Sequence, residues 1–296
     1  MISIIISSIR PKLLSNLKEN VKNTIGVDYE FIVINNNVEN LNISAAYNKG
    51  AEKAKYPYIV FCHEDILFHT QNWGKELIKL LNIDNVGLVG VSGATYKSQY
   101  PTSWISVPKK YYRINAIQRF KSGKREKITL NPQKENFSKV AVLDGFFLST
   151  TKKIFDSIKF DEKNLTGFHL YDLDYSLKIF KKYHIIVSHN ILIEHFSEGN
   201  LDKTWFNESI KWHKKHKKEL PIHVEPLNSY NIKEINYLAL QSVFLNCYKL
   251  SCHYGIMLTS FFTMIKTKPF SVINIKFLKY LLSFTIGLPK MKKLWK

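Results

Sequence analysis

The sequence has little cysteine, lacks the glycine-rich loops of common nucleotide-binding domains, and contains no long hydrophobic run. Its three cysteines (Cys62, Cys247 and Cys252) form no CxxC pair and cannot all pair with one another. This excludes a disulfide scaffold and favours a reducing compartment. The absence of GxGxxG after the first apolar run and of GxxxxGK[ST] anywhere argues against a dinucleotide-binding Rossmann domain and a P-loop NTPase. No stretch reaches the roughly 18–20 apolar residues that span a bilayer, so we expect no transmembrane helix.

Acidic residues are also scarce. The 296 residues include 24 Asp and Glu against 43 Lys and Arg, which gives a formal net charge of +19. Such an excess indicates an anionic partner, and the candidates are nucleic acid, anionic lipid or a phosphorylated substrate. Hydrophobic residues make up 45% of the chain and aromatic residues 14%, which excludes intrinsic disorder. The length suffices for one large core, or for a core domain plus an appendage.

The N-terminal segment Met1–Ser8 is apolar but has no basic residues before it, and Arg10-Pro11 closes it early. A secretory signal peptide needs a basic start and a longer apolar region. We therefore interpret this segment as a buried first strand and expect the protein to stay in the cytoplasm.

Strand and helix patterns alternate over the first ninety residues, which predicts βαβ units and a mostly parallel sheet. The expected strands are Ile2–Ser7, Tyr29–Ile34, Tyr58–Cys62 and Val86–Val91, and the expected helices are Pro11–Thr24, Ile43–Lys55 and Trp73–Leu81. Ligands of such sheets bind at the carboxyl ends of the strands. Polar residues collect at those ends, at Ser7-Ser8, at Asn35 and at His63-Glu64-Asp65.

The rest of the chain divides by composition. Residues 96–138 are basic and rich in turns, which predicts a loop-rich insertion, short antiparallel strands or a lid that faces anionic groups. After this segment, the sequence again predicts regular secondary structure, with a strand at Val140–Leu148, a helix at Tyr171–Lys182 and a strand at Ile191–Ile193. We expect a catalytic domain over 1–220 and a basic amphipathic helical region over 221–296.

Within that last region, residues 231–296 contain ten lysines against one acid, Glu234. Helices that combine lysines with large apolar residues, but are too short to span, suit an anionic membrane interface. The alternative is that these helices pack on the core with their lysines facing water.

Three clusters carry candidate chemistry. His63-Glu64-Asp65 ends a buried strand, and adjacent carboxylates repel one another unless a cation such as Mg²⁺ or Mn²⁺ shares the site. The alternative is a strand that exits into solvent. Asp172 and Asp174 lie at a predicted helix start, where an acid either favours the helix dipole or acts as a general base. His195 follows a short strand, and a lone histidine there is either structural or a ligand.

The order of these segments resembles the GT-A fold glycosyltransferases of family 2, in the bacterial branch that makes capsule, lipopolysaccharide or antibiotic sugars. The resemblance covers roughly residues 1–205. The matching segments, in order, are Ser7-Ser8, Asn35-Asn36, Tyr47-Asn48-Lys49-Gly50, His63-Glu64-Asp65, Leu143-Asp144-Gly145, Tyr171-Asp172 and His195–Gly199.

Three positions depart from the family pattern. His63 replaces the first Asp of the DxD metal motif, which leaves Asp65 as its second Asp. Tyr171 replaces the Glu of Glu-Asp, so that the catalytic base rests on Asp172 alone. Asn35 replaces the Asp near the nucleobase, and it can still hydrogen-bond a base edge without adding charge.

The resemblance implies an α/β GT-A fold, with a mostly parallel sheet flanked by helices and a basic helical C-terminal extension. It implies an enzyme that transfers a sugar from a nucleoside-diphosphate sugar to a hydroxyl of a saccharide or lipid-linked acceptor, with inversion. The implied donor-binding residues are Ser7, Ser8, Arg10, Asn35, Asn48, His63 and Glu64. Asp65 and His195 would hold Mg²⁺ or Mn²⁺, Asp172 would act as base, and Asp144 and Asp174 would bind the acceptor. The basic tail would hold the enzyme at the inner face of the cytoplasmic membrane.

Other functions fit less well. A nucleotidyltransferase shares a similar sheet and an acidic metal site, but it has a Gly-rich basic loop after strand one, where this chain has Ser8-Ile9-Arg10-Pro11. A nucleic-acid-binding protein would have Arg-rich clusters with exposed aromatics, whereas this basicity is mostly lysine, so we expect no nucleic-acid partner. A non-catalytic partner subunit of a glycosyltransferase complex is compatible with the altered metal motif.

Overall fold

The chain folds into two compact units. The computed structural model describes residues 1–120, 122–197, 199 and 201–286. Unit 1 comprises Met1–Lys97 and Lys109–Gly199, and unit 2 comprises Ser98–Pro108 and Asn200–Lys296. The boundary that composition predicts at 220/221 therefore falls inside unit 2. The helix that precedes this boundary packs on the helical region, because Phe206 and Asn207 contact His253. The charge of the sequence does not change at a point that would indicate this packing.

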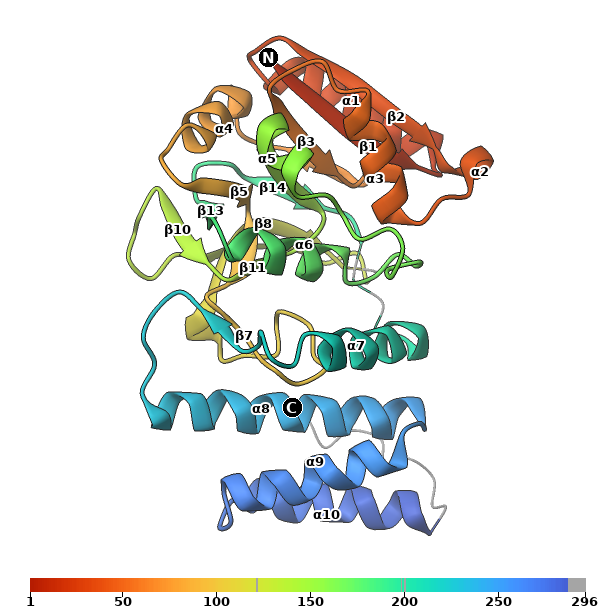
Figure 1. The fold of residues 1–296 in the computed structure, drawn as a ribbon, viewed down its shortest axis with the longest axis vertical. Helices are drawn as coiled ribbons and strands as arrows, with labels where there is room; N and C mark the ends of the chain where they lie inside the picture. Colours follow the sequence, from red (N-terminus) through yellow and green to blue (C-terminus); the bar gives the residue numbers. More distant parts are fainter. Residues whose placement is uncertain (121, 198, 200, 287–296) are drawn as a thin grey trace. The chain divides into compact units, whose positions relative to one another are not determined.

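A seven-stranded mixed sheet forms the centre of unit 1, in the order β10-β13-β5-β12-β3-β1-β2 (Figure 1). Its strands are β1 (Ile2–Ser8), β2 (Tyr29–Asn35), β3 (Tyr58–Cys62), β5 (Val86–Gly90), β10 (Phe137–Val140), β12 (Phe147–Thr151) and β13 (His184–Ser188). β1 runs parallel to β2 and β3, whereas β12 runs antiparallel to β3. The carboxyl ends of β1, β2 and β3 consequently lie at one edge.

A second sheet in unit 1 has the order β11-β6-β8-β14-β4, with β9 paired to β8. Its strands are β4 (Ile66–Phe68), β6 (Ser92–Ala94), β8 (Tyr112–Arg119), β9 (Arg125–Leu130), β11 (Val142–Leu143) and β14 (Ile193–His195). Two further short strands are β7 (Tyr96–Lys97), in unit 1, and β15 (Ile222–His223), in unit 2.

Helices cover the central sheet. The helices of unit 1 are α1 (Pro11–Thr24), α2 (Asn36–Glu39), α3 (Ile43–Glu52), α4 (Trp73–Leu81), α5 (Lys152–Ser157) and α6 (Tyr171–Phe180), with a 3₁₀ turn at Lys109–Tyr111. Tyr47 of α3, Phe155 of α5 and Tyr175 of α6 share one buried cluster with Phe61 of β3. Because α3 and α6 pack on the same face, their N-terminal regions and the ends of β1 and β3 border a common space.

The structure confirms the predicted α/β class, changes two local assignments and decides between the alternatives for a third segment. The expected strand Val140–Leu148 is interrupted at Asp144-Gly145-Phe146, because β11 pairs with β6 of the second sheet and β12 with β3 of the first. Of the alternatives predicted for residues 96–138, the structure shows short antiparallel strands, because β8 pairs with β9. The late strand lies at Ile193–His195, where it pairs with β4 and β8, and His195 is its last residue.

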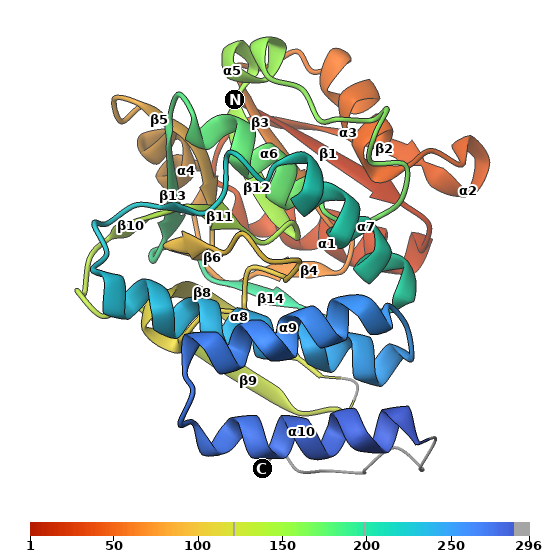
Figure 2. The same ribbon diagram turned by 60° about the horizontal axis from the view of Figure 1, so that its bottom comes forward.

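Unit 2 is helical, as predicted for the C-terminal extension. Its helices are α7 (Lys203–Lys215), α8 (Ser229–Leu250), α9 (Tyr254–Thr267) and α10 (Val272–Thr285) (Figure 2). Phe244 of α8 packs edge-on against Phe277 of α10 with ring centroids 4.8 Å apart, and the Tyr237 hydroxyl donates a hydrogen bond to Asn274. None of the helices in the described part of the chain has the length and apolar character needed to cross a bilayer.

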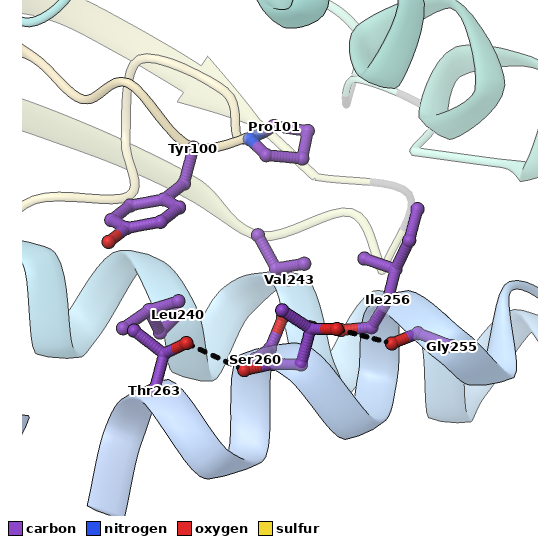
Figure 3. Close-up of a pocket in the computed structure, with 9 residues that line it drawn as sticks. Tyr100, Pro101, Leu240, Val243, Gly255, Ile256, Ser260 and Thr263 are labelled. Carbon is purple, nitrogen blue, oxygen red and sulfur yellow. Dashed lines mark hydrogen bonds between the residues drawn. The ribbon is translucent and has the colours of Figure 1, made fainter. Parts of the chain in front are cut away.

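A cavity of about 240 Å³ lies within unit 2, between the segment at Tyr100-Pro101 and helices α8 and α9 (Figure 3). The hydroxyls of Thr259, Ser260 and Thr263 donate their protons to carbonyls one turn earlier in α9. The cavity therefore offers mostly apolar surface, and we assign no chemistry to it.

Candidate active site

Glu64 holds the end of β1 against the end of β3. Its carboxylate accepts a 2.6 Å hydrogen bond from the Ser8 hydroxyl and further bonds from the backbone N–H groups of Ile9 and Arg10. Because Pro11 begins α1 and no side chain caps that helix, these bonds fix the turn that leads into it. Through these hydrogen bonds, Glu64 stabilises the edge of the sheet where β1 and β3 end.

Arg10 is placed by the same contacts. Its Nε lies 3.3 Å from Glu64, and its Nη2 lies 3.1 Å from Asp65 Oδ2. Its side chain is half exposed, whereas both carboxylates are buried. The guanidinium therefore presents a positive charge to the adjoining space while Asp65 keeps a second oxygen for other partners.

That second oxygen faces two histidines. Asp65 Oδ1 lies 3.8 Å from His63 Nδ1 and 3.7 Å from His195 Nε2, and the three potential ligand atoms all lie within 4.8 Å of one another. Ligand atoms about 2.1 Å from one ion are separated by roughly 3–4.2 Å, and both distances from Asp65 Oδ1 fall in that range, as a single divalent cation requires. His63, Asp65 and His195 are the residues that could hold the predicted metal.

Electrostatics favour the protonation states that a metal needs. Burial and the nearby His195 lower the pKa of His63 to about 4, so its imidazole is neutral. Burial alone would raise the pKa of Asp65, but His63 and His195 lower it below its usual range. A neutral imidazole and an ionised carboxylate are the ligating forms of these side chains.

Asp172 has the properties of a base at neutral pH. It lies in the first turn of α6, where its Oδ1 accepts a 2.9 Å hydrogen bond from the Leu173 backbone N–H. Burial, reinforced by the negative charge of Asp144, raises its pKa from 3.8 to about 7. A carboxyl group tuned to this range can accept a proton from a hydroxyl near neutral pH.

The basic insertion serves His195 indirectly. Arg119 Nη2 and Arg125 Nε, from the β8–β9 hairpin, lie 2.8 and 2.9 Å from the buried carboxylate of Glu194, and His69 lies 2.8 Å from it. This ion cluster fixes β14, which carries His195 as its last residue. The composition of residues 96–138 allowed a lid that faces anionic groups, whereas these two arginines of the segment pair with a buried acid.

A cavity of about 540 Å³ opens beside these groups. It is within the usual size range of ligand pockets. The residues that line it are Ser7, Ile9, Arg10, Asn36, Asn40, Leu41, Asn42, Ile43, His63, Glu64, Asp65, Thr166, Gly167, Phe168 and Ser197. Arg10 can bind phosphate oxygens, and the amide side chains of the three lining asparagines can hydrogen-bond a base or a ribose. The lining therefore suits a nucleotide.

Some residues expected from the sequence are used elsewhere. Asn48 bonds the backbone of Phe160 through both its amide oxygen and nitrogen, which ties α3 to a loop. Asp174 is buried and pairs with Lys178 at 2.8 Å, four residues along the same helix. Asn35 ends β2 beside Ser8, but its neighbour Asn36 lines the cavity instead.

The cavity also contains residues that the sequence did not single out. Phe168 is 56% exposed and lies beside the His63 ring, with centroids 5.5 Å apart. Thr166 and Gly167 accompany it in the loop before α6, and Ser197 bonds His195 at 3.1 Å. No motif marks Thr166, Gly167 and Phe168, and only their position next to α6 could have indicated them. Ser197 lies within the matching segment His195–Gly199.

Comparison with solved structures gives a distant likeness. A crystal structure of GalNAc-T7 with UDP, GalNAc and Mn²⁺ matches with a TM-score of 0.48 and 11% sequence identity, over 67% of this chain. The match spans only 44% of that protein's length. No curated protein sequence matches the chain.

The sequence model of a glycosyltransferase-like family matches residues 5–221. This segment contains every predicted site residue and both sheets of unit 1 apart from the first three residues of β1. It spans well over half of the chain. The chain therefore belongs to the glycosyltransferase-like family, and the expectation of a glycosyltransferase is confirmed at that level.

Proposed function

We propose that this chain transfers a sugar from a nucleoside-diphosphate sugar to a hydroxyl of a saccharide or lipid-linked acceptor. The single observation that carries the proposal is the convergence of His63, Asp65 and His195, the first two of which line a cavity together with Arg10. Glycosyl transfer from such a donor needs a site that binds a diphosphate, and this arrangement offers both a cation-binding group and a guanidinium.

The residues divide the work as follows. His63, Asp65 and His195 would hold Mg²⁺ or Mn²⁺, which when bound would offset the charge that builds on the departing diphosphate. Arg10, fixed by Glu64, adds a second positive charge at the same place. Asn36 and Asn42 line the cavity and can hydrogen-bond a base or ribose.

Asp172 would act on the acceptor. It takes the proton of the attacking hydroxyl, whose oxygen bonds to the anomeric carbon as the bond to the diphosphate breaks. One base and one attack from the face opposite the leaving group give inversion at that carbon. Asp144, whose charge raises the pKa of Asp172, is close enough to orient the acceptor.

We further propose that the enzyme works at an anionic membrane surface, on the inner face of the cytoplasmic membrane, in bacterial surface polysaccharide synthesis. Four exposed apolar residues lie on one side of α10 or directly after it, at helical spacing: Ile275, Leu278, Leu282 and Ile286, which are 42–65% exposed. Lys276 and Lys279 border this stripe and face solvent. Four of the lysines counted in the tail (290, 292, 293 and 296) lie outside the described residues.

Acidic charge is almost absent from this surface. Glu234 is the one acid of residues 231–296, and it forms an ion pair with Lys268. A helix with an apolar stripe edged by lysines and no acid suits the interface of a bilayer that contains anionic lipid. A lipid-linked acceptor would be reached at the same surface.

The transfer proposal is tested by thermal stabilisation of the full chain with UDP, GDP, CDP, dTDP and ADP, each with Mn²⁺ or Mg²⁺. One diphosphate should raise the melting temperature, and a chelator or Asp65→Asn should abolish the shift. Asp84→Asn, at an exposed position, is the matched control and should keep it. Stabilisation by no nucleotide, or an unchanged shift in Asp65→Asn, would contradict the proposal.

A further inference from the structure

We propose that Tyr171 is a positioning residue that keeps the proton of His63 on Nε2 and thereby presents the Nδ1 lone pair toward Asp65 and His195. The consequence for metal binding rests on the cation site proposed above. The proton assignment itself depends only on hydrogen-bond geometry within unit 1.

The assignment follows from two contacts of one hydroxyl. The Tyr171 oxygen lies 2.8 Å from His63 Nε2 and 3.0 Å from the carbonyl oxygen of Gly145. A carbonyl oxygen only accepts, so the single hydroxyl proton of Tyr171 is donated to Gly145. His63 Nε2 must then be the donor to the Tyr171 oxygen. The opposite arrangement would set two lone pairs against each other 3.0 Å apart, between Tyr171 and Gly145.

Among the residues that the structure describes, none offers the other ring nitrogen of His63 a comparable partner for a proton. The nearest carboxylate oxygen, Asp65 Oδ1, is 3.8 Å from Nδ1, which is too long for a hydrogen bond. His63 forms a group of potential metal ligands with Asp65 and His195, and Nδ1 is its ring nitrogen on the side of Asp65. A neutral imidazole ligates through its unprotonated nitrogen, and the hydrogen bond at the other nitrogen decides which one that is.

The surroundings hold the hydroxyl where this role requires it. Tyr171 is 4% exposed, and its ring packs edge-on against Tyr47 with centroids 5.7 Å apart. At Gly145, a Cβ would lie 2.3 Å from the Tyr171 hydroxyl, so only glycine permits this approach. His63 and Tyr171 are two of the three positions that depart from the family motifs. Their direct contact makes them one linked change rather than two separate losses.

The first test reads the proton position directly in the metal-free protein. Long-range ¹⁵N–¹H correlation spectra of the ¹⁵N-histidine-labelled chain, with His63 assigned through His63→Gln, should show the Nε2–H tautomer. In Tyr171→Phe, the signals of His63 should move to the Nδ1–H form or to a mixture. Tyr175→Phe is the matched control: it removes another buried hydroxyl from α6, where the ring stacks on Phe160, and should leave the spectrum unchanged. An Nδ1–H tautomer in the unmodified chain, or an unchanged His63 in Tyr171→Phe, overturns the proposal.

The second test measures Mn²⁺ affinity by calorimetry. Loss of such a supporting hydrogen bond typically weakens metal binding by about 10–100-fold. We expect Tyr171→Phe to bind Mn²⁺ at least about tenfold more weakly than the unmodified chain, with Tyr175→Phe unchanged. In a His63→Ala background, Tyr171→Phe should cause no further loss; an equal loss there overturns the link through His63. If the unmodified chain binds no Mn²⁺, the cation site fails, and the spectra alone decide the proton assignment.

Discussion

Asp144 and Asp172 are close enough that the charge of the first adds to burial in raising the pKa of the second to about 7. The two carboxyl groups come from different elements: Asp144 lies in the crossover between the two sheets and Asp172 in the first turn of α6. The backbone N–H of Asp144 bonds the carbonyl of Ser92, which fixes the crossover. The pair is therefore built into the fold of unit 1.

Sugar transfer should depend on the ionised form of Asp172. Below a pH of about 7 its carboxyl is protonated and cannot accept the acceptor proton. We expect kcat/KM to rise about tenfold per pH unit below that point and to level off above it. Asp172→Asn should lower kcat by about 10²–10⁴-fold and remove the acidic limb of the profile, which is the rise of kcat/KM with pH. A limb that persists in Asp172→Asn would show that another group is the base.

Asp144→Asn provides the matching electrostatic test. It removes the negative charge that adds to the pKa of Asp172. The acidic limb of the kcat/KM profile should therefore move to lower pH. This shift separates the charge of Asp144 from any contact with the acceptor, which would change KM without moving the limb. A limb that stays in place would mean that burial alone sets the pKa.

The same pKa predicts a cost in stability. The folded pKa of Asp172 lies above its ordinary 3.8, so stability falls as pH rises from about 4 to about 7. Asp172→Asn carries no charge and escapes this loss. Its melting temperature at pH 8 should exceed that of the unmodified chain, by about 2–4 °C per kcal/mol gained, and the two should converge toward pH 4. If the two proteins had equal melting temperatures at pH 8 as well as at pH 4, the raised pKa of Asp172 would be contradicted.

Much of unit 1 could be predicted from the sequence because its signals are local. The strand Tyr58–Cys62 and the helices Pro11–Thr24 and Trp73–Leu81 occur as predicted, since apolar periodicity and Pro11 mark them directly. The division at Asp144-Gly145-Phe146 could not be predicted in the same way. It depends on which sheet each half joins, and that choice is made by partners far along the chain.

The candidate site shows the same contrast. His63 and Asp65 follow the end of β3, as the strand pattern predicted. His195 joins them because β14 of the second sheet pairs with β4, which sets His195 opposite Ile66, and the sequence pattern did not show this pairing. The use of Asn48 and Asp174 was decided by neighbours that the motif does not contain, Phe160 and Lys178. The contact between His63 and Tyr171 joins residues 108 positions apart, and no local pattern records it.

The ligand set should favour Mn²⁺ over Mg²⁺. Two imidazoles and one carboxylate suit Mn²⁺ better than Mg²⁺, which prefers oxygen ligands throughout. We expect calorimetry to show at least about tenfold tighter binding of Mn²⁺, and His63→Asp to narrow that preference. His184→Asp, at an exposed histidine, is the control and should change neither affinity. Equal affinities in the unmodified chain would count against His63 as a ligand.

Glu64 should matter for stability as well as for donor binding. It is buried and accepts bonds from Ser8, Ile9 and Arg10, so Glu64→Ala would leave several donors without a partner. We expect a loss of about 2–4 kcal/mol in the free energy of unfolding, measured by urea denaturation. The exposed Glu52, which pairs with Lys159, is the control, and Glu52→Ala should cost under about 1 kcal/mol. Similar losses in both variants would mean that the Glu64 network contributes little.

Membrane binding should require both the apolar stripe of α10 and its lysines. Replacing Ile275, Leu278 and Leu282 together by serine removes exposed apolar surface without touching the buried side of the helix. We expect binding to vesicles of phosphatidylglycerol and phosphatidylcholine, measured by sedimentation, to weaken at least about tenfold, because each buried methylene contributes about 0.8 kcal/mol. Val38→Ser, at a still more exposed apolar position in unit 1, should bind normally.

Lysine substitutions distinguish binding to an anionic lipid surface from binding that depends on apolar contact alone. Each of Lys276→Gln and Lys279→Gln should weaken binding to phosphatidylglycerol vesicles about fivefold, since a lysine near such a surface is worth about 1 kcal/mol. Binding to vesicles of phosphatidylcholine alone should be weak and should not change in these variants. High salt should reduce the binding of the unmodified chain, because the attraction acts between exposed charges. Equal binding to both vesicle types, or no effect of the serine substitutions, would assign this face of α10 to another partner.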